Sequence, residues 1–192
     1  MNPDTYQIKI TLRDSHPPIW RCIQVRSDLT LRVLNRVIQE TMGWENSHLH
    51  RFTFKKKDYG WPDPDGELDI KNDSIVHLNK VITGKGQCFI YEYDFGDSWE
   101  HYCVVEKVLP FDENKPAALC IAGARACPPE DVGGIPGYEE FLEAVRHPNH
   151  QRHKEMLDWA GGAFDSEAFD FNGVNKRLQR VIRRPRKQRA AT

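Results

Sequence analysis

The chain has 192 residues, of which 39% are hydrophobic and 29% are charged, and its formal net charge is −1. This length is enough to bury one core, and no apolar run approaches the ~20 residues that a membrane-spanning helix needs. The first residues have neither the basic nor the apolar segment of a secretory signal. We therefore expect a cytoplasmic protein that makes no use of a membrane.

The cysteines are odd in number and scattered: Cys22, Cys88, Cys103, Cys120 and Cys127. Such a set is typical of reduced thiols rather than of a disulfide framework. The spacing between Cys120 and Cys127 is longer than the about two to four residues of a usual zinc-binding pair. Two readings stay open: a pair of buried thiols, or a metal site completed by Cys103 or His101.

The charge is distributed unevenly. Residues 176–192 contain eight Lys or Arg and no acid, which leaves 19 basic against 28 acidic residues in the rest. A basic end on an acidic body is typical of segments that bind nucleic acid, and also of solvated termini that offset the charge of the body. The candidate nucleic-acid residues of this tail are Arg180, Arg183, Arg184, Arg186, Lys187 and Arg189.

In chain order, apolar residues alternate from Tyr6 to Leu12 and predict a strand. Pro17 and Pro18 interrupt it, and residues 19–26 predict a second, antiparallel strand. Apolar residues at helical spacing over 30–42 then predict a helix that ends at Gly43. Residues 48–54 predict a third strand, followed by a turn-rich connection and a short strand over 74–78.

The stretch 88–109 predicts a β-hairpin with its turn at Gly96-Asp97, where Gly96 would supply a positive φ. If the turn has an even number of residues, one face carries two carboxylates, a tryptophan and a histidine: Glu92, Asp94, Trp99 and His101. The other face then packs into the core with Phe89, Tyr91, Tyr93, Tyr102 and Val104. A slip of one residue would exchange the faces of the outgoing strand.

After the hairpin, residues 119–134 are dense in Pro and Gly and predict irregular backbone. Helices are predicted over 137–146, between Asn149 and Gly161, and from Asn172 to the residues before Pro185. Runs of strands followed by runs of helices predict an α+β fold with a mixed or largely antiparallel sheet, a central hairpin, one crossing helix and a C-terminal helical segment. The opening order of elements is similar to a β-grasp. We expect one domain over 1–182 and a basic tail over 183–192.

Histidines and acids on the third strand, the hairpin and the Pro/Gly segment form one candidate cleft: His48, His50, Glu92, Asp94, Asp97, Trp99, His101, Glu130 and Asp131. Imidazole and carboxylate groups bind divalent transition metals, and His48, His50, Asp94 and His101 are the candidate ligands. Acid–base catalysis without a metal is a second hypothesis. Mutual hydrogen bonding in a purely structural role is the third.

Several of these segments together resemble the plasmid pRiA4b ORF-3-like family: residues 17–21, 42–44 with 48–50, 93–101, and 126–134 with 137–138. The resemblance implies a cytoplasmic α+β protein of bacteria or archaea, often linked to plasmids or transposable elements. Some relatives are labelled resolvase, but no serine-recombinase pattern is visible in this sequence. The resemblance therefore supports the fold and identifies no reaction.

The sequence leaves two functions open. The first is a non-enzymatic binding module for nucleic acid, through the basic C-terminus, or for a protein partner associated with a mobile element. The second is a metal-dependent hydrolase with its site on the hairpin over 91–102. For either one, the histidines of the third strand, the acids of the hairpin and the Pro/Gly segment should converge on one end of the sheet.

Overall fold

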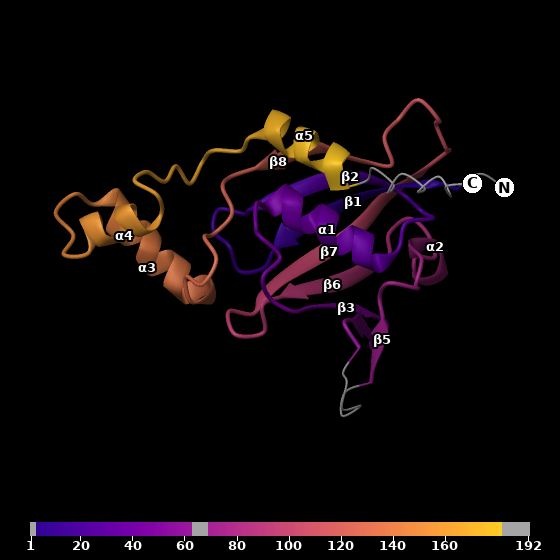
Figure 1. Ribbon diagram of the computed structural model, residues 1–192, viewed down its shortest axis with the longest axis horizontal. Helices are drawn as coiled ribbons and strands as arrows, with labels where there is room; N and C mark the ends of the chain where they lie inside the picture. Colours follow the sequence, from indigo (N-terminus) through magenta and orange to yellow (C-terminus); the bar gives the residue numbers. More distant parts are fainter. Residues whose placement is uncertain (1–2, 63–68, 182–192) are drawn as a thin grey trace, which may run out of the picture.

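The computed structural model describes residues 3–62 and 69–181, in which an eight-stranded sheet is combined with five helices (Figure 1). The strands are β1 (Thr5–Leu12), β2 (Trp20–Arg26), β3 (His50–Phe54), β4 (Lys57–Gly60), β5 (Ile70–Asn72), β6 (Cys88–Tyr93), β7 (Trp99–Leu109) and β8 (Ala118–Ala124). The helices are α1 (Leu31–Met42), α2 (Leu78–Val81), α3 (Gly134–Arg146), α4 (His153–Trp159) and α5 (Phe171–Val181). The expected α+β class is confirmed.

The sheet order is β5-β4-β3-β6-β7-β1-β2-β8, and every pair except β4–β5 is antiparallel. The hairpin β6–β7 thus lies at the centre of the sheet, as predicted. The likeness to a β-grasp remains an analogy based on element order. No helix in the described part of the chain is both long and apolar enough to cross a bilayer.

Helix α1 crosses one face of the sheet, with α5 beside it (Figure 1). The Thr30 side chain accepts a hydrogen bond from the Val33 amide, and Gly43 ends the helix at a φ of 103°. Its apolar stripe packs on one face of the sheet, as predicted. The residues expected in this core are all fully or almost fully buried: Leu34, Ile38, Phe89, Tyr91 and Tyr93.

The predicted hairpin register is wrong by one residue. Tyr93 pairs with Trp99 and Tyr91 pairs with His101, so the turn has five residues, an odd number. Positive φ angles occur at Asp94 and Ser98, and Gly96 does not have one. As a result Trp99 and His101 point into the core, and Tyr102, which was expected there, is 46% exposed.

Two further elements differ from the sequence-based expectation. The segment expected to be irregular begins with strand β8, because pairing with β2 satisfies its backbone groups; Gly123 lies within the strand, and the other Pro and Gly residues follow it. Asn175 of α5 hydrogen-bonds the amide and carbonyl of Cys120, which covers the outer edge of β8. The strand expected over 74–78 is a single bridge at His77, followed by α2.

Arg21 of β2 is a charged residue inside the core, with 1% exposure. Its guanidinium donates hydrogen bonds of 2.7–2.8 Å to four carbonyl oxygens, those of Trp20, Thr41, Ala124 and Arg125. The ring of Phe169 stacks on it at 4.1 Å. The side chain therefore connects β2, the end of α1, the end of β8 and the segment before α5.

We expect Arg21→Met to lower the free energy of unfolding by about 3 kcal/mol or more, because buried carbonyls lose their donors. Arg36→Met, on the exposed side of α1, is the matched control and should change it by less than about 0.5 kcal/mol. Urea denaturation measures both. Equal stability of the two variants would show that the guanidinium network contributes little.

Candidate functional site

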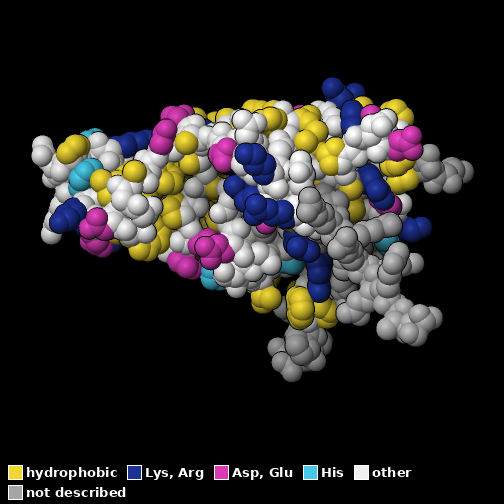
Figure 2. All heavy atoms as spheres, turned by 45° about the horizontal axis from the view of Figure 1, so that its top comes forward, with side chains coloured by type: hydrophobic (Ala, Val, Ile, Leu, Met, Phe, Trp, Pro, Cys, Tyr) yellow, Lys and Arg dark blue, Asp and Glu magenta, His cyan; other side chains and the backbone are white. Residues whose placement is uncertain are grey.

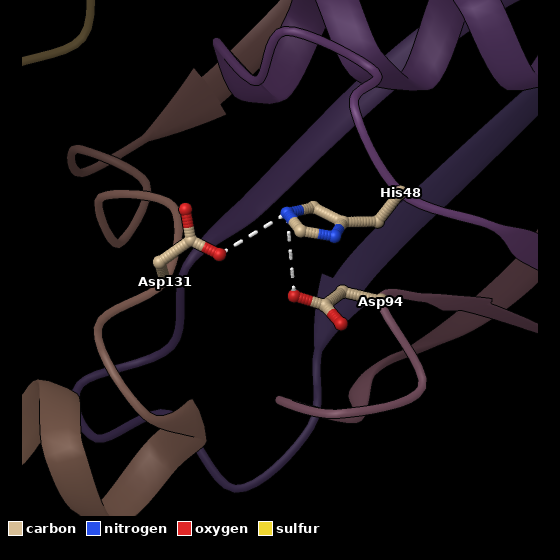
Figure 3. A group of neighbouring side chains, drawn as sticks. All are labelled: His48, Asp94 and Asp131. Atoms are coloured by element: carbon tan, nitrogen blue, oxygen red, sulfur yellow. Dashed lines mark ion pairs between the residues drawn. The ribbon is translucent and has the colours of Figure 1, made fainter.

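Four side chains from three separate segments meet at the end of the central hairpin. His48 Nε2 lies 3.2 Å from Asp131 Oδ1, 3.7 Å from Asp94 Oδ2 and 3.8 Å from Glu130 Oε2. Figure 3 shows the His48 ring directed between Asp94, from the hairpin turn, and Asp131, from the segment before α3. We call these four residues the carboxylate–histidine cluster.

Asp94 is held by the turn that follows β6. Its Oδ1 accepts hydrogen bonds from the amides of Gly96 (3.0 Å) and Asp97 (3.4 Å), an arrangement that Asp favours at a positive φ. Its Oδ2 is left to face His48. The turn thus fixes the carboxylate and assigns each oxygen a separate direction.

Glu130 divides its two oxygens in the same way. Its Oε1 accepts hydrogen bonds from the Tyr93 hydroxyl (3.0 Å) and the Glu45 amide (2.6 Å), and Oε2 faces His48. The Tyr93 hydroxyl also accepts from the amides of Ser47 and His48. Burial raises the pKa of Tyr93, so its hydroxyl keeps the proton that it donates to Glu130.

Two contacts attach the Pro/Gly segment to the rest of the site. The Trp44 indole N–H donates to the Pro128 carbonyl at 3.0 Å, and the Gly133 amide donates to Asp97 Oδ2 at 3.1 Å. At Gly134, which has a φ of 67°, a Cβ atom would lie 2.6 Å from the Asp97 carbonyl oxygen. Asp97 therefore positions the segment that carries Glu130 and Asp131.

An open cavity of about 600 Å³ adjoins the cluster. His48, Glu130 and Asp131 line one side of it, and Trp44 and Trp159 are among the other lining residues. The Asp131 carboxylate is 71% exposed, so a ligand in solution reaches the cluster directly. The geometry is that of a surface site with room beside it for a small molecule or a peptide side chain.

His50, a candidate for the same cleft, has a different partner. Its Nε2 lies 2.9 Å from Asp73, whose other oxygen accepts two hydrogen bonds from Arg32. Burial alone would raise the pKa of Asp73, but the hydrogen bonds from His50 and Arg32 hold it below its usual value. His48 lies two residues before His50, outside β3, and the two rings are displaced from each other along the chain. The two histidines therefore contact separate groups of acids.

His101, Trp99 and Glu92 also lie outside the cluster. The odd turn places His101 and Trp99 in the core, where both rings pack against Trp44 at 5.3 and 5.9 Å. Glu92 points to the opposite face and pairs with Arg51. Among the described side chains, His48, Asp94 and Asp131 are the group whose ligand atoms lie close enough to share a metal ion.

The cluster has more acidic than basic groups, because three carboxylates surround one imidazole. In a zinc site, bonds of about 2.0–2.2 Å place neighbouring ligand atoms about 3–3.5 Å apart. The Asp131 and Asp94 oxygens lie 3.2 and 3.7 Å from His48 Nε2, which is close to this spacing, whereas Glu130 is not part of the group that could share one ion.

The sequence did not indicate the roles of Tyr93 and Trp44, which position the cluster. Both look like ordinary core aromatics, because apolar patterning gives no information about where a hydroxyl or an indole N–H points. The Tyr-Asp-Phe-Gly-Asp pattern over 93–97 held the only available signal: a tyrosine directly before an acid-rich turn.

The structure is thus that of an α+β protein with an acidic site at the hairpin end of its sheet. The model of the plasmid pRiA4b ORF-3-like protein family matches residues 4–173, and the chain belongs to that family. It is 40% identical over 174 residues to the uncharacterized protein y4hQ of Sinorhizobium fredii (strain NBRC 101917 / NGR234), with 88% of each chain covered.

The fold is also similar to a solved structure. The crystal structure of MM3350, a protein of unknown function from Methanosarcina mazei Go1, superposes with a TM-score of 0.81 at 34% identity. The match covers 90% of this chain and 98% of that one. The family and the fold are thereby established, and the function has to be argued from the site.

His101 gives a pH prediction. Complete burial lowers the pKa of His101 to about 4, whereas in the unfolded chain it is about 6.5. The unfolded state therefore binds the proton first, and stability falls as the pH drops from about 6.5 to about 4, by about 3 kcal/mol from this residue. Below that range the residue contributes no further loss.

The measurement is denaturant unfolding of wild type and His101→Gln between pH 7 and pH 4. The variant should lose less stability over this range, and the exposed control His147→Gln should follow the wild type. An NMR titration of the wild-type His101 ring tests the same point without a variant. A pKa near 6.5 would contradict the expectation.

Proposed function

We propose that this protein binds a divalent transition-metal ion at the carboxylate–histidine cluster and acts as a cytoplasmic, metal-dependent hydrolase on a ligand in the adjacent cavity. One observation carries the proposal: Asp94 and Glu130 each commit one oxygen to fixed hydrogen bonds and direct the other at His48 Nε2. Hydrogen-bonded carboxylates that present a second oxygen are the usual arrangement around protein-bound metals.

The donor set favours a transition metal over calcium or magnesium. Imidazole nitrogen is a ligand that zinc, iron and manganese accept in company with carboxylates, whereas calcium and magnesium sites use oxygen. His48 and Asp131 are accessible, at 32% and 71% exposure of their side chains. A metal ion held there would keep positions open for water and substrate, as catalytic sites do.

Such an ion would supply an activated water at neutral pH. The residues of the chain would position the metal ligands and the substrate. Tyr93 and Asp97 would keep the ligands in place, and the cavity would hold the substrate beside them. A structural ion pair between protonated His48 and the acids is the alternative, and a direct metal titration distinguishes the two.

We expect protein purified without an affinity tag to bind Zn²⁺ or Mn²⁺ with a stoichiometry of one. Asp131→Asn and His48→Gln should lower the affinity by about 100-fold or more, and Tyr93→Phe by about tenfold because it affects positioning only. Isothermal titration calorimetry gives all three values.

Asp14→Asn is the matched control for Asp131→Asn. Both residues are exposed, both have a φ of 57°, and asparagine tolerates that conformation. The control should bind metal like the wild type. If the wild type binds neither ion with a dissociation constant below the millimolar range, the metal proposal is overturned.

A second candidate function, nucleic-acid binding, is favoured by a different face. Arg36 of α1 and Lys176 and Arg180 of α5 are exposed on two helices that pack side by side. Figure 2 shows Lys and Arg side chains in the middle of this face. The predicted tail follows a single domain over 1–182 and would add further positive charge to this function. Its residues lie outside the described part of the chain: Arg183, Arg184, Arg186, Lys187 and Arg189.

If this face binds duplex DNA, affinity should fall by roughly 0.9 log unit per phosphate contact for each log unit of salt. The double variant Arg36→Gln/Arg180→Gln should reduce that slope by the amount expected for about two phosphate contacts. Deletion of 183–192 should reduce it further. Lys115→Gln, an exposed residue away from both helices, is the control. Binding without salt dependence would exclude this function.

A further inference from the structure

The cavity beside the carboxylate–histidine cluster has a one-sided charge. Glu45, Glu130 and Asp131 line it together with His48, and none of its lining residues is Lys or Arg. A divalent ion at the cluster would offset two of the carboxylate charges. Because Glu45 and one further charge would remain, the cavity stays negative with the metal bound.

An arginine of a neighbouring hollow does not change this balance. Arg152 lines a neighbouring hollow that shares Asp131 and Trp159 with the cavity. Its guanidinium is paired with Glu155 through contacts of 2.9 and 3.2 Å. A phosphate or carboxylate group entering the cavity would therefore meet acids without a Lys or Arg side chain to receive it.

The remaining walls are aromatic and apolar. Trp44 forms the inner wall, fixed by its bond to Pro128 and by stacking on Tyr93 at 5.1 Å. Trp159 of α4 is 48% exposed, and its ring rests on Phe141 at 5.9 Å. Indole faces beside carboxylates are the combination that binds organic cations.

We propose that the substrate of this site carries an amino or guanidino group on an apolar stem, as a basic peptide side chain does, and that the site does not act on nucleic acids. The inference rests on the proposed metal-dependent function, because it names the class of molecule brought to that metal. The stem would lie against Trp159 and the cation near Glu45. The basic face of α1 and α5 is a separate surface and takes no part in this recognition.

Three probes of similar size and different charge test the inference: phenethylamine, 2-phenylethanol and 3-phenylpropionate. Tryptophan fluorescence and calorimetry follow their binding to wild-type protein, with and without Zn²⁺. We expect phenethylamine to bind at least tenfold more tightly than 3-phenylpropionate in both forms, with 2-phenylethanol between them.

Two pairs of variants locate the binding. Glu45→Gln should weaken phenethylamine about tenfold without affecting 2-phenylethanol, and Glu113→Gln, an exposed acid elsewhere, should affect neither. Trp159→Ala should weaken both ligands, and Trp61→Ala, which removes another exposed tryptophan, should not.

The outcomes separate this inference from the metal proposal. Zinc binding combined with equal or tighter binding of 3-phenylpropionate overturns the substrate class and leaves the metal site standing. Selective binding of phenethylamine by a protein that binds no zinc overturns the hydrolase proposal and supports the cationic-ligand cavity. Phenethylamine binding that is unchanged in Glu45→Gln and Trp159→Ala overturns the location proposed for it.

Discussion

The site depends on the length of one turn. Because five residues connect β6 and β7, Tyr93 pairs with Trp99, and every side chain of β7 has the opposite orientation from the one an even turn would give. This register puts His101 in the core and leaves Asp94, at a positive φ, to direct one oxygen toward His48. The inner face of the hairpin then becomes the wall against which Trp44 and the Pro/Gly segment pack.

The cluster is built from segments that are far apart in the sequence, and hydrogen bonds hold them together. The Tyr93 hydroxyl joins the chain at Ser47 and His48 to Glu130, and Asp97 joins the hairpin turn to Gly133. Such bonds fix carboxylates whose mutual repulsion would otherwise separate them.

Two surfaces of opposite charge follow from the arrangement. The cavity at the hairpin end is acidic and aromatic, and the face formed by α1 and α5 is basic. The net charge of −1 conceals this separation. A polyanion and a cationic substrate would approach different sides of the molecule, so the two candidate functions are physically independent.

Local patterning alone determined the strands β1, β2 and β6, the helix α1 with its end at Gly43, and the burial of Leu34, Ile38 and Tyr91, because apolar periodicity is a property of neighbouring residues. The family could be recognised from motifs that the structure distributes between site and core, as with Arg21 and Trp44. Strand β8, the odd turn, the partner of His50 and the meeting of His48 with Asp94 and Asp131 were decided by the tertiary structure. Strand pairing and the return of a Pro/Gly segment over a hairpin depend on contacts between residues far apart in the chain, and no local pattern encodes them.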